Sequence, residues 1–84
     1  MRLYEAVAKR IVELCNDKGI TINALANICG MPSANIKNIQ YGRSKNPGLK
    51  IIVQICNGLD ITIEEFFHSD VFKDYKYFDE IMKF

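Results

Sequence analysis

The sequence predicts an all-α domain of five short helices followed by a C-terminal helical extension. Apolar residues recur at spacings of three and four along each predicted helix, and glycine or proline separates most of these stretches. The chain of 84 residues suffices for one hydrophobic core, and 49% of the residues are apolar, which is typical of a packed globular domain. The one alternating stretch, residues 61–63, is too short to predict a strand.

Glycine and threonine mark the ends of the first two helices. The first helix is predicted over residues 4–18, where apolar side chains share one face, and it ends at Gly19 after a basic last turn. Thr21 is a favourable cap for a second helix over residues 22–29, which Gly30 ends.

Three further helices are predicted before residue 68. A third helix over residues 33–41 precedes a polar, basic loop at residues 43–48. The fourth helix, over residues 49–57, is predicted to stop before Gly58, and a short fifth helix holds residues 64–67.

Residues 22–39 have the spacing of a helix-turn-helix unit. Two helices that cross over a three-residue turn approach closely, so the contact position on the first helix must be small, and Ala26 occupies it. The turn needs a residue that tolerates a left-handed conformation, which Gly30 supplies. The other positions that require apolar packing are all apolar: Leu25, Cys29, Met31, Ile36 and Ile39.

Charge is distributed unevenly along the chain. The formal net charge is only +1, but residues 1–50 carry +5 and residues 51–84 carry −4. No acidic residue occurs between Asp17 and Asp60, and this interval holds the cations Lys18, Lys37, Arg43, Lys45 and Lys50. A surface with cations and no carboxylates attracts phosphate, so a nucleic acid is the expected partner.

Other classes of function lack the residues that they need. The three cysteines, Cys15, Cys29 and Cys56, are odd in number and widely spaced. The single histidine, His68, belongs to no ligand-spaced group, so we expect no metal, no cofactor and no disulfide. No triad, carboxylate pair or glycine-rich phosphate loop predicts an enzyme, and no small-molecule ligand is indicated. Free thiols, with no secretory signal and no membrane-spanning apolar run, indicate a cytoplasmic protein.

The helix-turn-helix unit and its flanks resemble the Cro/repressor-type (XRE-like) family of transcriptional regulators. The resemblance covers about residues 4–67 and is carried by Gly19-Ile20-Thr21, Ala24-Leu25-Ala26, Gly30-Met31-Pro32-Ser33, Ile36, Ile39, Gly42, Pro47, Leu49 and the run from Ile55 to Phe67. It implies a five-helix, repressor-like DNA-binding domain over residues 1–67, with residues 68–84 as an extension. It also implies double-stranded DNA as the partner.

The resemblance further implies which residues contact DNA. In this family the second helix of the motif lies in the major groove. At the matching positions of this chain, the residues expected to face the groove are Ser33, Ala34, Lys37 and Asn38, and Asn35 is expected nearer the DNA backbone. Asn38 is expected to recognise adenine, and Lys37 to reach guanine or phosphate. The residues expected at phosphates are Arg43, Ser44 and Lys45 of the following loop, and Thr21 and Asn23 at the start of the second helix.

The chain departs from the family at two places. Ile22 stands where many members have a phosphate-binding glutamine. Gln40 stands where many have a glutamate that pairs with an arginine of the first helix, and Cys15 takes the place of that arginine.

The C-terminal extension continues the helical spacing as an aromatic-rich stripe of Val71, Phe72, Tyr75, Phe78 and Met82. This sixth helix either folds back on the core or pairs with the same helix of a second chain. A five-helix domain is already closed, so the added apolar surface favours a homodimer. Two-fold symmetry would place the two recognition helices about 34 Å apart, to match a palindromic operator.

A protein-interaction module on the same fold is the alternative function, for example an antitoxin or the target of an anti-repressor. In that case the acidic, aromatic C-terminal third is the contact surface, and the groove-facing helix contacts no DNA. The two functions differ in their affinity for duplex DNA. A regulator should bind duplex DNA with an affinity that falls steeply as the salt concentration rises, whereas the module should show no such affinity.

Overall fold

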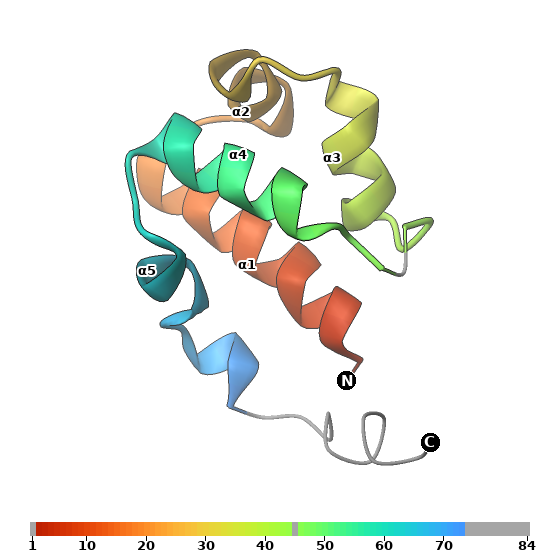
Figure 1. Ribbon diagram of the computed structural model, residues 1–84, viewed down its shortest axis with the longest axis vertical. Coiled ribbons are helices and arrows are strands. Elements are labelled where there is room, and N and C mark those ends of the chain that lie inside the picture. Colours follow the sequence, from red (N-terminus) through yellow and green to blue (C-terminus); the bar gives the residue numbers. More distant parts are fainter. Residues whose placement is uncertain (1, 45, 74–84) are drawn as a thin grey trace.

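The computed structural model, which describes residues 2–44 and 46–73, is helical in the way that the sequence predicts (Figure 1). Its elements are α1 (Leu3–Lys18), α2 (Ile22–Cys29), α3 (Ser33–Gln40), α4 (Leu49–Leu59), α5 (Ile63–Phe67) and a single 3-10 turn, η1 (Asp70–Phe72). The long α1 runs through the middle of the molecule, with α2 and α3 on one side and α5 and η1 on the other. The prediction of an all-α class with five helices is confirmed.

One core joins all of these elements. α2 packs against both α3 and α4, and α1 packs against α3 and η1. The buried apolar residues are Ala6, Val7, Ile11, Leu14, Cys15, Leu25, Ala26, Met31, Ile36, Ile39, Ile52, Ile55, Cys56, Leu59, Phe66 and Phe72. Removing these side chains from water is the main favourable contribution to folding.

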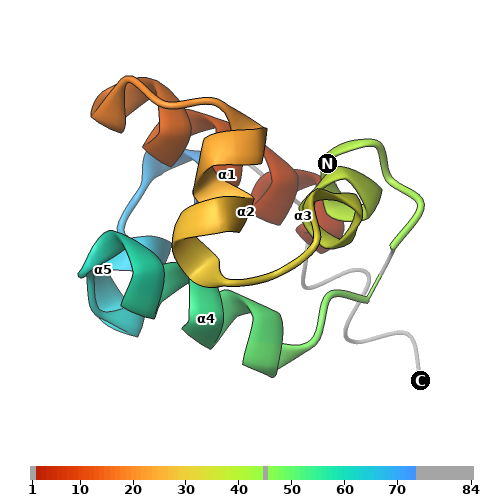
Figure 2. The ribbon, with the colours of Figure 1, turned by 90° about the horizontal axis from the view of Figure 1, so that it is seen from above.

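The turn between α2 and α3 forms as the helix-turn-helix spacing predicts. Ala26 is 1% exposed at the helix crossing, and Gly30 adopts a left-handed conformation with φ of 69°. The N–H of Met31 donates to the carbonyl of Ala26 at 3.0 Å, which closes the end of α2. Figure 2 shows α2 and α3 joined by this short turn, with α3 at an edge of the molecule.

The end of α4 differs from the prediction. The helix continues through Gly58 to Leu59, and Asp60 supplies the left-handed residue, with φ of 56°. Gly58 serves packing instead, because a Cβ there would lie 2.6 Å from the Sγ atom of Cys29 on α2. The absence of a side chain at Gly58 therefore allows α2 and α4 to approach closely.

Arg10 of α1 is buried, at 9% exposed, although the apolar spacing of the sequence places it on the polar side of the helix. Its guanidinium donates to the backbone carbonyls of Phe66 (2.5 Å) and Glu65 (2.8 Å), and to the carboxylate of Glu13 (2.7 Å). The hydroxyl of Ser69 also donates to Glu13, at 2.7 Å. Arg10 thus satisfies the last carbonyls of the short α5 and fixes it to α1.

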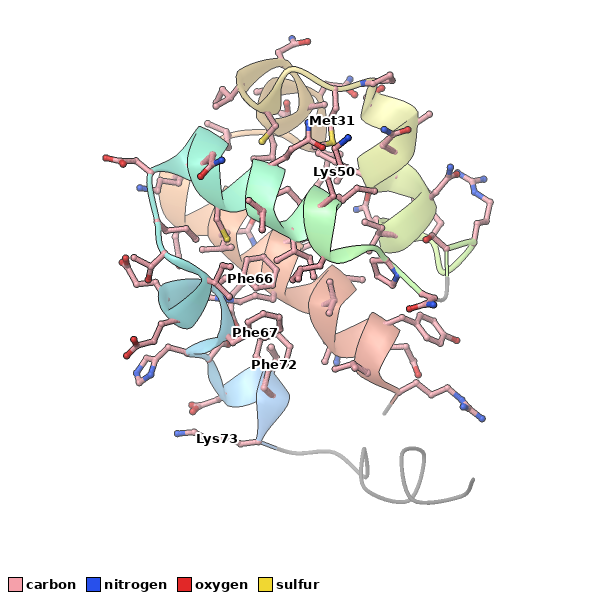
Figure 3. All side chains as sticks on the ribbon, in the orientation of Figure 1. Met31, Lys50, Phe66, Phe67, Phe72 and Lys73 are labelled. Atoms are coloured by element: carbon pink, nitrogen blue, oxygen red, sulfur yellow. The ribbon has the colours of Figure 1, made fainter. Side chains whose placement is uncertain are left out.

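The folded core continues beyond residue 67, where the sequence analysis ends the domain. Phe72 is 8% exposed, and its ring centroid lies 5.0 Å from that of Phe67 and 6.4 Å from that of Phe66 (Figure 3). Phe72 therefore packs against its own chain, as expected of the alternative in which the extension folds back on the core. Val71 is half-buried against the same core. The other residues expected at the dimer contact, Tyr75, Phe78 and Met82, lie outside the described residues.

Three further features concern the class of protein. None of the helices within the described residues is long and apolar enough to cross a membrane. Over the same residues, no three His, Cys, Asp or Glu side chains gather in a way that could hold a metal ion. The three cysteines are free thiols, and burial raises the pKa of each one, which keeps them protonated near neutral pH.

Candidate nucleic-acid interface

α3 has one apolar side and one polar side. Ile36 and Ile39 are fully buried on the inner side, where α3 packs against α1 and α2. The outer side carries small and polar residues that are exposed or half-buried: Ser33, Ala34, Asn35, Lys37 and Asn38. Because residues four apart share a helix face, this side forms one continuous strip. α3 itself lies at an edge of the molecule (Figure 2).

The loop after α3 folds back onto the last turn of that helix. Gly42 allows the reversal with a left-handed φ of 75°, and the N–H of Ser44 donates to the backbone carbonyl of Asn38 at 2.9 Å. The Nε atom of Arg43 donates to the side-chain oxygen Oδ1 of Asn38 at 3.0 Å. The Arg43 guanidinium also lies 5.4 Å from the ring centroid of Tyr41, within cation–π range. These contacts place Arg43 beside the polar strip of α3.

The start of α2 offers a second set of polar groups. The hydroxyl of Thr21 accepts a hydrogen bond from the N–H of Ala24 at 3.0 Å, so its predicted capping role is confirmed. Asn23 is exposed in the first turn. Ile22, at the family's glutamine position, is half-buried and packs against the core. Ile22 therefore contributes packing at a place where other members of the family bind phosphate.

The charges around α3 differ in sign from those around α5. Within the described residues, neither Lys37 nor Arg43 forms an ion pair with a carboxylate. Four acidic residues, Glu13, Glu64, Glu65 and Asp70, belong to α5, to η1 and to the part of α1 that contacts them. The cations Lys37 and Arg43 are therefore available to attract a phosphate that approaches α3 and its loop.

The structure brings most of the predicted contact residues together. The five residues of α3 lie on one strip, with Arg43 and Ser44 directly next to them, while Lys45 lies outside the described residues. The pairing of Asn38 with Arg43 is not predicted from the sequence. The two residues are five positions apart with Gly42 between them, and this spacing predicts a contact only if the chain is known to reverse at that glycine.

A comparison with protein families decides the class of this interface. The model of the Cro/C1-type HTH DNA-binding domain matches residues 10–69, which is more than half of the chain. The chain belongs to the Cro/C1-type HTH family. The match spans α2, α3 and the loop after α3, so the polar strip belongs to the DNA-binding unit of this Cro/C1-type domain. No curated protein and no solved structure matches the chain.

Proposed function

We propose that this Cro/C1-type protein is a sequence-specific regulator of transcription, acting as a repressor, and that α3 enters the major groove of double-stranded DNA. One observation carries the proposal: the outer strip of α3 adjoins a loop whose Arg43, like Lys37 of α3, forms no ion pair with a carboxylate within the described residues. A helix with small and amide side chains on its outer face suits close approach to base edges. The residues proposed at bases are Ser33, Ala34, Lys37 and Asn38, with Asn35 nearer the backbone.

Contacts to phosphate hold the domain in register on the duplex. We assign them to Arg43, Ser44 and Lys45 of the loop, and to Thr21 and Asn23 at the start of α2. The first-turn N–H groups of α2 support this role, because the amino end of a helix attracts anions. Since Ile22 cannot bind phosphate, the loop cations carry a larger share of the electrostatic attraction.

The protein is proposed to act as a homodimer in the cytoplasm. Tyr75, Phe78 and Met82, together with half-buried Val71, remain the proposed contact between two chains. A two-fold dimer would present two copies of α3 about 34 Å apart, on successive major grooves. Three protonated, unpaired thiols suit a reducing compartment.

The salt dependence of duplex binding tests the proposal. Fluorescence anisotropy with a labelled duplex should show that the logarithm of the affinity falls linearly with the logarithm of salt concentration, by about 0.9 per phosphate contact. Arg43→Ala should reduce this slope by about one, because Arg43 is assigned to a phosphate. Lys73→Ala is the matched control, because Lys73 lies near η1, away from α3 (Figure 3).

A protein-interaction module is the second candidate function, favoured by the acidic side chains around α5 and η1. That surface would bind a basic partner and leave α3 unused. Absence of duplex binding at low salt, or equal slopes for Arg43→Ala and Lys73→Ala, would favour this alternative over the regulator.

A further inference from the structure

Asn38 and Arg43 are joined within the protein itself. The Nε–H of Arg43 donates to Oδ1 of Asn38 at 3.0 Å, and the N–H of Ser44 donates to the backbone carbonyl of Asn38 at 2.9 Å. The guanidinium lies 5.4 Å from the centroid of the Tyr41 ring. One side-chain bond, one backbone bond and one ring contact therefore hold Arg43 in a defined position at the end of the α3 strip.

This pairing determines which hydrogen-bonding groups of Asn38 remain for a ligand. An asparagine amide has one acceptor oxygen and a nitrogen with two N–H donors. Recognition of adenine uses both, because the oxygen accepts from the N6 amino group while the nitrogen donates to N7. In this chain Oδ1 of Asn38 already accepts from Arg43, and a positive charge lies beside it. One lone pair of Oδ1 is therefore occupied, and an amino group that approaches the other meets the positive charge of the guanidinium, which disfavours it.

Apart from the second lone pair of Oδ1, which lies beside the Arg43 charge, the groups that remain are donors. They are the Nδ2–H₂ of Asn38 and the terminal N–H groups of Arg43, whose Nε is already bonded. In the major groove, guanine presents two acceptors, N7 and O6, whereas adenine and cytosine each present an amino donor and thymine presents one acceptor beside a methyl group. Guanine is the base that best matches a set of donors.

We infer that Asn38 and Arg43 act as one donor unit that recognises guanine, and that Arg43 is a specificity-determining residue and not only a phosphate contact. This inference rests on the proposed function and refines it. It replaces adenine, the base that the asparagine amide alone suggests for Asn38, because the partner of Oδ1 is visible only in the fold.

Selection of duplexes from a random pool tests the inference, with wild type, Asn38→Ala, Arg43→Met and Lys73→Met compared. Asn38→Ala identifies the base pair that Asn38 contacts, since preference is lost there. At that pair the wild type should favour guanine over adenine by about tenfold. Arg43→Met should shift the preference to adenine, because Oδ1 becomes free to accept from the amino group. Lys73→Met removes the same charge far from α3 and should leave the preference unchanged.

A double-mutant cycle separates this role from a purely electrostatic one. If the two side chains act as a unit, the double variant Asn38→Ala/Arg43→Met should lose less affinity for the guanine site than the product of the two single losses. A wild-type preference for adenine at that pair, or the same preference in Arg43→Met as in wild type, would overturn the inference alone. A wild type that enriches no duplex would overturn the proposed function together with the inference.

Discussion

Two charged residues of α1 anchor the part of the chain that follows the helix-turn-helix unit. Arg10 donates to backbone carbonyls of α5 and to Glu13, and Glu13 accepts in turn from Ser69. The hydrogen bond from Ser69, with that from Arg10, holds the pKa of Glu13 below its usual range. Ionised Glu13 therefore stabilises the folded state.

This anchor predicts a pH-dependent effect of Glu13→Gln. A carboxyl group whose pKa is lowered by folding contributes stability above its unfolded pKa, and that contribution is lost as the pH falls through the folded pKa. Glu13→Gln should therefore lower the urea midpoint at about pH 7, and its difference from wild type should shrink towards about pH 3. Circular dichroism of urea unfolding measures this, with exposed Asp17→Asn as the control. A difference that is constant across this pH range would contradict the assignment.

Single residues also show what a sequence can and cannot predict. Thr21 and Gly30 act through neighbours within a few positions, so their roles follow from local chemistry and are confirmed. Arg10 finds its partners 55 and 56 positions away, at carbonyls that exist only because α5 ends there. The bond from Arg43 to Asn38 likewise depends on a chain reversal. Charged side chains with distant backbone partners leave no periodic signal in a sequence.

Among the helices, the contact of α2 with α4 depends on one missing side chain. A Cβ on Gly58 would lie 2.6 Å from Sγ and 3.3 Å from Cα of Cys29. From the sequence, Gly58 is predicted to end the helix, because glycine near the end of a helical stretch commonly has that role. The actual end comes at Asp60, which adopts a left-handed conformation without being a glycine.

Gly58→Ala should therefore destabilise the fold although alanine favours helices. Alanine gains about 1 kcal/mol over glycine inside a helix, but overpacking a close helix contact costs about 1–3 kcal/mol, so we expect a net loss of about 1 kcal/mol in the free energy of unfolding. Gly48→Ala, at the N-cap of α4, is a control for loss of a glycine without crowding, because a Cβ there meets no atom within 4 Å. Thermal unfolding of both variants measures the change in stability. A Gly58→Ala variant as stable as wild type would show that α2 and α4 can move apart without loss of free energy of unfolding.

Taken as a whole, the molecule has Lys37 and Arg43 on and after α3, and the carboxylates of Glu64, Glu65 and Asp70 on α5 and η1. The core that joins these two parts includes Phe72, so residues up to η1 belong to the folded unit. A helix-turn-helix pattern predicts the five helices well because each apolar position is set by local periodicity. The same pattern cannot show that a single aromatic residue beyond α5 returns to the core.

Two truncations distinguish the core from the proposed dimer contact. A chain that ends at Lys73 keeps Phe72 and should remain folded but become monomeric, because it lacks Tyr75, Phe78 and Met82. A chain that ends at Phe67 also loses Phe72 and the Ser69 hydrogen bond, and its free energy of unfolding should fall by about 3 kcal/mol. Light scattering and thermal unfolding measure the two effects. Dimers of the chain that ends at Lys73 would refute the proposed contact.

The most direct test of the account is a map of the DNA contact on the folded protein. A selected duplex is titrated into ¹⁵N-labelled protein, and the amide resonances are followed by nuclear magnetic resonance. If α3 enters the major groove, the largest shifts should fall on α3, on residues 43–44 and on the first turn of α2. Shifts confined to α5 and η1, with α3 unchanged, would contradict the claim that α3 enters the major groove.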